Sequence, residues 1–199
     1  MSEFLRLGLN PQLQRACDVV GYSLPTPIQE KAIPLLLQGH DVLGIAQTGT
    51  GTTAAYALPI LMRCKYMQGS LPRALILAPT RELVMQIHEV MVGLAQFTDL
   101  RILALYGGLG PKTQIQTLEA GVDILVSTPG RFLELYRKEA IGTKDLKYLI
   151  LDEADKMMDM GFMPQIRQIL EKIPYKKRQN GLFSATFPEK VENLSHEFL

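Results

Sequence analysis

Six short apolar runs alternate with segments of helical periodicity, and this alternation restricts the fold of the chain more than any other feature. Each run is rich in aliphatic residues and is bounded by turn-forming or charged residues, as is typical of buried strands. The predicted strands are Val42–Ala46, Ala74–Ala78, Ile102–Leu105, Ile124–Val126, Tyr148–Leu151 and Leu182–Ser184. Alternating strands and helices predict an α/β fold with a mainly parallel sheet covered on both faces.

The segments between the strands carry apolar residues at helical spacing. They predict helices at Thr53–Met67, Glu82–Ala95, Lys112–Ala120, Arg131–Arg137 and Met163–Ile173. Two further helices, Pro11–Val19 and Ile28–Leu37, are predicted before the first strand. We therefore expect residues 1–38 to form a leading helical segment of one domain that continues through residues 39–199. Residues 69–73 and 175–180 are predicted to be exposed loops. Leu199 is expected to lie inside a helix, which indicates a fragment cut at a domain border.

Composition excludes several classes of protein. A length of 199 residues fits one domain, and 47% hydrophobic with 21% charged residues is ordinary for a globular protein. No stretch approaches the roughly 20 apolar residues that span a bilayer, and no secretory signal is present, so we expect a cytoplasmic protein without membrane contact. Cys17 and Cys64 have no CxxC partner and indicate neither a zinc site nor a disulfide framework. A net charge of +1 argues against holding nucleic acid mainly through an overall positive field.

Polar clusters follow every predicted strand. In an open parallel sheet, ligands bind at the carboxyl ends of the strands, so these clusters predict one functional edge. The clusters are Gln47–Thr53, Pro79–Glu82, Gly107–Gly108, Thr128–Arg131, Asp152–Asp155 and Ser184–Thr186.

The cluster after the first strand has the layout of a phosphate-binding loop, in which glycines let backbone N–H groups approach phosphate oxygens at a helix amino end. The usual pattern ends in Gly-Lys-Ser/Thr, where the lysine reaches the β and γ phosphates and the hydroxyl binds magnesium. Here Thr52 stands at the lysine position and Thr53 supplies the hydroxyl. The whole predicted loop is Ala46, Gln47, Thr48, Gly49, Thr50, Gly51, Thr52 and Thr53. Taken alone, it could also be an ordinary tight connection.

Loss of the lysine removes a charge-assisted contact of about 1.5–3 kcal/mol, while the backbone cradle, the helix dipole and the Thr53 hydroxyl are retained. The transition state of phosphoryl transfer should lose more, because charge develops there. We therefore expect impaired nucleotide binding and still weaker hydrolysis. The sequence leaves open whether Thr52 is natural or engineered.

The fifth predicted strand is followed by Asp152-Glu153-Ala154-Asp155. Magnesium prefers carboxylates, often through water, and a carboxylate beside the γ phosphate can orient an attacking water. Asp152 is therefore expected to hold the metal and Glu153 to act on the water. A solvated helix start is the alternative, since acidic residues favour the first helical turn.

Together the motifs resemble those of the DEAD-box family of superfamily 2 helicases, in the family's order. The matching segments are Gly21–Gln29, Pro79–Leu83, Thr128–Arg131, Asp152–Asp155 and Ser184–Thr186. With Phe4 upstream, the resemblance covers residues 4–186. It implies a RecA-like, N-terminal motor domain that binds ATP, Mg²⁺ and RNA, is monomeric, and works with a second RecA-like domain.

The resemblance also implies roles for single residues. Gln29 would read the adenine, with Phe4 stacking on the base and Tyr22 beside it, although Phe4 could instead pack the leading helix. Asp155, Ser184 and Thr186 would couple nucleotide state to RNA remodelling. RNA contacts would fall on Pro79, Thr80, Arg81, Glu82, Gly107, Gly108, Thr128, Gly130 and Arg131. Thr80 and Thr128 would also cap helices.

Three hypotheses about function follow from this resemblance. The first is an enzyme half that is nearly inactive alone, because the second domain and the arginines it supplies to the ATP site are absent. The second is a non-hydrolysing RNA- or partner-binding pseudo-ATPase, to which the missing lysine points. A DNA-directed helicase is a third hypothesis, weakened by the full acidic box joined to the adenine-reading segment.

Overall fold

The computed structural model describes residues 3–47, 49 and 51–199, and its framework is a six-stranded sheet in the order β1-β6-β5-β2-β4-β3. Every neighbouring pair is parallel, with Ala74 opposite Tyr148 across β2 and β5. The strands are β1 (Val42–Ile45), β2 (Ala74–Leu77), β3 (Ile102–Leu105), β4 (Ile124–Ser127), β5 (Tyr148–Leu151) and β6 (Gln179–Ser184). The predicted parallel α/β fold is confirmed.

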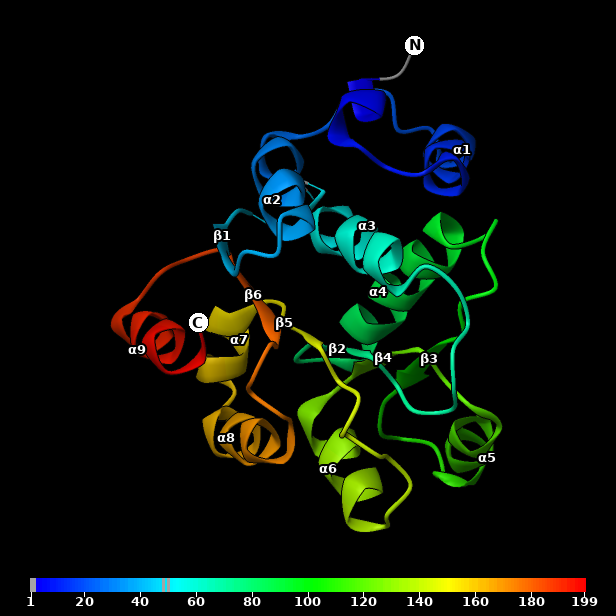
Figure 1. Cartoon of the computed structure of the whole chain (residues 1–199). Helices are drawn as coiled ribbons and strands as arrows, with labels where there is room; N and C mark the ends of the chain where they lie inside the picture. Colours follow the sequence, from blue (N-terminus) through cyan, green and yellow to red (C-terminus); the bar gives the residue numbers. More distant parts are fainter. Residues whose placement is uncertain (1–2, 48, 50) are drawn as a thin grey trace.

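Helices cover both faces of the sheet (Figure 1). The helices of the first face are α1 (Pro11–Val20), α2 (Pro27–Leu37), α3 (Thr52–Cys64) and α4 (Arg81–Leu94), preceded by the 3₁₀ turn η1 (Glu3–Leu7). The second face carries α5 (Lys112–Ala120), α6 (Pro129–Arg137), α7 (Ala154–Asp159), α8 (Met163–Lys172) and α9 (Glu189–Phe198). Side chains alternate between the two cores along each strand, so Ile76 packs into the first and Leu75 and Leu77 into the second. None of the described helices is long and apolar enough to cross a membrane.

The predicted start of β6 and the predicted end of the loop before it were both wrong, because polar residues belong to the strand. β6 begins at Gln179 rather than Leu182, because Gln179 and Asn180 find partners beyond their own strand. The Gln179 amide donates to the Leu36 and His40 carbonyls, and the Asn180 N–H donates to Asp41 Oδ1 at 2.8 Å. The predicted exposed loop 175–180 is therefore shorter than expected.

Other differences lie at helix ends. α3 stops at Cys64, three residues before the predicted end, where Lys65 adopts a left-handed φ of 62°. α6 starts two residues early, at Pro129, since proline suits the first position of a helix. The short helix α7 and η1 were not predicted. Leu199 was expected inside a helix, but α9 ends at Phe198 and Leu199 is its C-cap.

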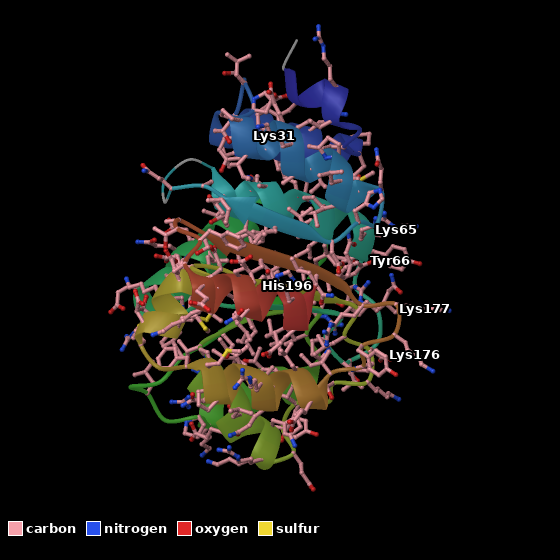
Figure 2. The ribbon with its side chains drawn as sticks, turned by 90° about the vertical axis from the view of Figure 1, so that its left-hand side faces the viewer. Lys31, Lys65, Tyr66, Lys176, Lys177 and His196 are labelled. Atoms are coloured by element: carbon pink, nitrogen blue, oxygen red, sulfur yellow. The ribbon has the colours of Figure 1, made fainter. Side chains whose placement is uncertain are left out.

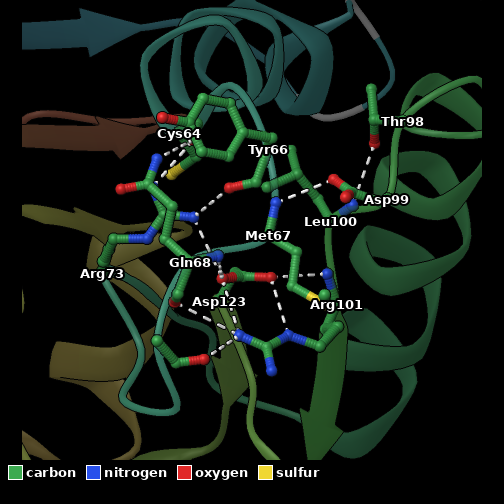
Figure 3. Close-up of polar contacts among 11 residues, drawn as sticks. Cys64, Tyr66, Met67, Gln68, Arg73, Thr98, Asp99, Leu100, Arg101 and Asp123 are labelled. Atoms are coloured by element: carbon green, nitrogen blue, oxygen red, sulfur yellow. Dashed lines mark hydrogen bonds and ion pairs between the residues drawn. The ribbon is translucent and has the colours of Figure 1, made fainter.

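Asp123, just before β4, organises the edge at which the strands begin (Figure 3). Its side chain is fully buried, and its Oδ1 accepts from Arg73 at 3.0 Å and from the Gln68 N–H at 3.2 Å. Its Oδ2 accepts from the Arg101 N–H at 2.9 Å and the Arg101 side chain at 3.0 Å. Pro72 is buried, so the predicted exposed loop 69–73 is partly anchored in the core.

Both cysteines are buried free thiols. Burial, with a smaller contribution from Asp18, raises the pKa of Cys17 to about 11. Burial likewise raises the pKa of Cys64 to about 12. Both therefore remain protonated thiols at neutral pH.

Replacing Asp123 by Asn should lower the free energy of unfolding by about 2–4 kcal/mol, because two arginines lose a buried charged partner. Urea denaturation of Asp123→Asn against native protein tests this, with the exposed Asp145→Asn as the control that should change little. Equal stability of Asp123→Asn and native protein would show that the network contributes nothing.

Asp123 should also make the folding stability of the protein depend on pH. Burial alone would raise the pKa of Asp123, but hydrogen bonds from Arg101, Arg73 and the Gln68 N–H outweigh it and lower the pKa. A lowered folded-state pKa contributes stability that is present above the unfolded value of about 4 and is lost as pH falls through the folded value. The stability difference between native protein and Asp123→Asn should therefore shrink below about pH 4, as urea midpoints measured across that range would report.

Candidate functional site

The carboxyl ends of the strands place three of the predicted clusters around one pocket. β1, β6 and β5 are neighbours, so the segments that follow them meet although they are far apart in the sequence. The Ala46 N–H, for example, donates to the Ser184 carbonyl at 3.0 Å. The pocket has a volume of about 470 Å³, within the range of ligand sites. Its lining includes Phe4, Tyr22, Gln29, Ala46, Gly49, Gly51, Thr52, Thr53, Asp152, Glu153 and Ser184.

At one end of the pocket, Gln29 is held by the start of α2. Thr26 caps this helix, and the two residues form a reciprocal capping box in which the Thr26 N–H donates to Gln29 Oε1 at 2.9 Å. Gln29 Nε2 donates to the Gly51 carbonyl at 3.1 Å, which joins α2 to the phosphate loop. The Gln29 side chain is only 3% exposed, and its amide plane is therefore fixed.

Phe4 and Tyr22 border the same end. Their rings stack at a centroid distance of 5.6 Å, and Phe4 is 1% exposed within the first core. Phe4 therefore packs the leading segment, as the alternative interpretation held, and also lines the pocket.

The phosphate loop is described in part, because Thr48 and Thr50 lie outside the described residues. Gly49 and Gly51 have φ values of 87° and 86°, which favour glycine. A Cβ at Gly51 would lie 2.4 Å from Gln29 Nε2, so this close approach also requires glycine. The buried Thr52 hydroxyl has no hydrogen-bond partner among the described residues. Gln47 is exposed and does not line the pocket.

Asp152 lies on the pocket wall at the end of β5 and is 5% exposed. Its Oδ2 accepts from the Tyr56 hydroxyl at 2.7 Å, and its Oδ1 accepts from the Glu153 N–H at 2.8 Å. Burial raises the pKa of Asp152 to about 6, although these hydrogen bonds oppose the rise. Both described hydrogen-bond donors to the Asp152 carboxylate are neutral, and a buried carboxylate without a charged partner retains strong affinity for a cation.

Glu153 adopts an unusual backbone conformation next to it. Its φ and ψ are 50° and 51°, the left-handed region that few residues other than glycine occupy. Non-glycine residues held there carry strain of about 1–3 kcal/mol and cluster at functional sites. The half-buried side chain lines the pocket beside Asp152.

Asp155 connects the acidic box to the segment after β6. The Thr186 N–H and hydroxyl donate to Asp155 Oδ2 at 3.1 and 2.8 Å, and the Asp155 N–H donates to Ser184 Oγ at 3.2 Å. Burial alone would raise the pKa of Asp155, but hydrogen bonds to its carboxylate, from Thr186 above all and from the Lys156 N–H, lower it. The acidic box and the Ser184–Thr186 segment are therefore in direct contact.

The segments after β2 and β3 also meet. Thr80 caps α4 by accepting from the Leu83 N–H at 3.2 Å, as predicted. The Arg81 guanidinium lies 4.9 Å from the Tyr106 ring and approaches Gly108, whose φ is 90°. Pro79 is buried, while Glu82 and Gly107 are exposed.

Arg131 is 7% exposed rather than displayed at the surface. Its Nη2 donates to the Leu109 carbonyl at 2.6 Å, and its Nε lies 3.3 Å from Glu134 Oε2. Thr128 occupies the cap position of α6, but its side chain makes no capping bond, so this part of the capping prediction was wrong. Gly130 is exposed in the first turn.

Tyr56 is the residue at this site that sequence reasoning missed. The only signal was a phenol inside an otherwise apolar helix, because a buried tyrosine hydroxyl usually has a partner. Among the described residues, no group of three or more His, Cys, Asp or Glu is placed to hold a metal. This is compatible with magnesium, which is commonly held by one or two carboxylates together with substrate phosphates and waters.

Known proteins resemble the whole chain. A family model described as DEAD/DEAH box helicase matches residues 26–194. DEAD-box ATP-dependent RNA helicase 28 of Oryza sativa is 45% identical over 97% of this chain and 24% of that protein. ATP-dependent RNA helicase DeaD of Buchnera aphidicola is 43% identical over 100% of this chain and 33% of that protein.

A solved structure supports the same relation. The hypothetical ATP-dependent RNA helicase from Sulfolobus tokodaii matches with a TM-score of 0.87 and 38% identity, over 96% of this chain and 55% of that chain. The expected RecA-like fold is thereby confirmed. The chain spans well under half the length of the curated relatives it matches. Sequence and fold together place this chain in the DEAD/DEAH box helicase family.

Proposed function

We propose that the chain is the N-terminal motor domain of an RNA helicase that couples ATP hydrolysis to RNA unwinding or remodelling. The observation that carries the proposal is the convergence of the phosphate loop, the acidic box and the Ser184–Thr186 segment on one pocket. A second RecA-like domain would close over this edge. A monomeric state and a cytoplasmic location remain predictions.

The adenine would bind between Gln29 and the Phe4–Tyr22 pair. An amide has two N–H donors and two acceptor lone pairs, and the bonds to Thr26 and Gly51 use one of each. The second donor and the second lone pair match the acceptor and donor at the edge of adenine. Because the amide plane is fixed, guanine cannot be accommodated by rotating it.

The phosphates would lie against the loop at the start of α3. The backbone at Gly49 leaves room for close approach, and the Thr52 hydroxyl, which has no hydrogen-bond partner among the described residues, can donate to a phosphate oxygen. Thr53 and Asp152 would hold magnesium, Asp152 through water, and the buried carboxylate fits a hard cation. When bound, magnesium would neutralise phosphate charge. Glu153 would orient the attacking water.

RNA would cross the ends of β2, β3 and β4 through its sugar-phosphate chain. Arg81, Thr80 and Gly108 offer a guanidinium, a hydroxyl and backbone N–H groups. The buried Arg131 would act by holding the Gly107–Leu109 loop in place. Figure 2 shows the exposed Lys65, Lys176 and Lys177 along one side of the molecule. Lys65 precedes β2 and the other two precede β6, so these lysines lie away from the edge of the sheet that carries the motifs.

Thr52 favours a second candidate function, a pseudo-ATPase that binds RNA or a partner without turnover. The intact Glu153 and the Asp155–Thr186 hydrogen bonds favour the motor instead. The experiment that decides between them is turnover in a two-domain protein with the lysine restored.

ATP and ADP should bind this chain about fivefold or more tightly than GTP, because guanine would leave the buried Gln29 amide unpaired at a cost of about 1–3 kcal/mol. Titration with fluorescent nucleotides measures this preference. Equal affinity for adenine and guanine nucleotides would refute the role given to Gln29.

Thr52→Lys should strengthen magnesium-nucleotide binding by about tenfold or more, as a charge-assisted phosphate contact of about 1.5–3 kcal/mol requires. Thr52→Gln is the matched control, since it adds length without charge and should give little gain. An unchanged dissociation constant for Thr52→Lys would mean that the loop does not hold phosphates as described.

Joining the Thr52→Lys domain to the second motor domain of a related helicase should give RNA-stimulated ATP hydrolysis. Glu153→Gln in that protein should abolish turnover while retaining nucleotide binding, because it removes the carboxylate and preserves the shape. Arg81→Ala should weaken RNA binding regardless of base sequence. If the two-domain protein bound ATP and RNA without RNA-stimulated turnover, the binding-module function would replace the motor.

A further inference from the structure

Tyr56 is a buried phenol at the junction of the phosphate loop and the acidic box. It lies in the first turns of α3, three residues after Thr53, and is fully buried. Its hydroxyl donates to Asp152 Oδ2 at 2.7 Å, across 96 positions of sequence. Residues three apart share a face of a helix, so Tyr56 and Thr53 lie on the same face of α3. The Tyr56 hydroxyl therefore contacts Asp152, one of the two side chains to which the proposed function assigns magnesium, and Tyr56 shares a helix face with Thr53, the other.

The contact fixes Asp152 completely. Oδ2 faces Tyr56 and Oδ1 accepts from the Glu153 N–H, so the carboxylate cannot rotate without losing a hydrogen bond in a buried place. Each oxygen keeps a further lone pair for another partner. Removal of the phenolic hydroxyl would free the carboxylate plane and raise the pKa of Asp152 further, while the position of Asp152 directly after β5 would not change.

The Tyr56 ring is itself held by a specific arrangement of the sheet. Phe183 on β6 packs against it, with ring centroids 5.3 Å apart and planes inclined at 49°. Gly44 is the register partner of Phe183 on β1, and a Cβ at Gly44 would lie 2.6 Å from the Phe183 ring. Glycine at this position lets Phe183 lie over the sheet and support Tyr56.

We propose that Tyr56 is a positioning residue for magnesium-nucleotide binding, whose hydroxyl orients the Asp152 carboxylate toward the metal. The inference rests on the proposed nucleotide function of the same pocket. A merely structural hydroxyl would affect folding stability and leave the metal-dependent part of nucleotide affinity unchanged. The contribution of magnesium to binding separates the two roles.

The test measures the affinity of this chain and its variants for fluorescent ADP, once in the presence of Mg²⁺ and once in the presence of EDTA. For Tyr56→Phe, which keeps the ring and its packing, affinity in EDTA should stay within about twofold of the native value. The gain in affinity that Mg²⁺ confers should fall about tenfold, as loss of a hydrogen bond to a charged group implies. A Mg²⁺ gain in Tyr56→Phe equal to the native gain would overturn the inference.

Controls separate the inference from the function on which it rests. Tyr148→Phe removes a half-buried hydroxyl from the opposite end of β5 and should keep the full Mg²⁺ gain. These affinities are measured at a temperature at which thermal melting shows each variant to be folded. The same measurements are repeated on Thr52→Lys. Phe183→Leu, which keeps the hydroxyl and loosens its support, should also reduce the gain. If the native chain and Thr52→Lys both lacked Mg²⁺-dependent binding, the proposed nucleotide function would fail, and the inference with it.

Discussion

Parallel pairing of all six strands is the constraint on which the rest of the structure depends. Because every strand runs in the same direction, every segment that follows a strand lies at one edge of the sheet. The order β1-β6-β5 then makes neighbours of residues 46, 152 and 184, which the chain keeps far apart. At the opposite edge, the acidic group is Asp123, which is fully buried and forms ion pairs with Arg73 and Arg101. The pocket and the buried ion-pair network thus lie at opposite ends of the strands.

Much of this arrangement could be predicted from local patterns. β3, β5 and α5 have the predicted bounds, since each is a simple apolar run or a regular helical repeat. The sites after the strands also follow from sequence, because a parallel sheet alone brings them to one edge. Strand order could not be predicted, since the pairing of parallel strands depends on how the crossover helices pack on the two faces. The polar start of β6 was missed for a related reason, because its partners Asp41 and Leu36 belong to distant segments.

Side-chain roles were less predictable than positions. Gln29 and Arg131 both occupy motif positions, yet the structure uses each of them for internal hydrogen bonds as well. Tyr56 belongs to no motif and contacts Asp152 across 96 positions of sequence, so no local pattern could predict the pair. Long-range partners of this kind decide whether a motif residue faces a ligand directly or positions another residue that does.

The hydrogen bonds that hold the pocket residues do not depend on residue 52, where the usual phosphate-binding loop has a lysine. The described partners of Asp152 are the Tyr56 hydroxyl and the Glu153 N–H, and both are neutral. Gln29 bonds to the Gly51 carbonyl, and Ser184 accepts from the Asp155 N–H. None of these bonds uses the side chain of residue 52. The acidic box and the Gln29 end of the pocket are therefore held by described hydrogen bonds in which the Thr52 side chain takes no part.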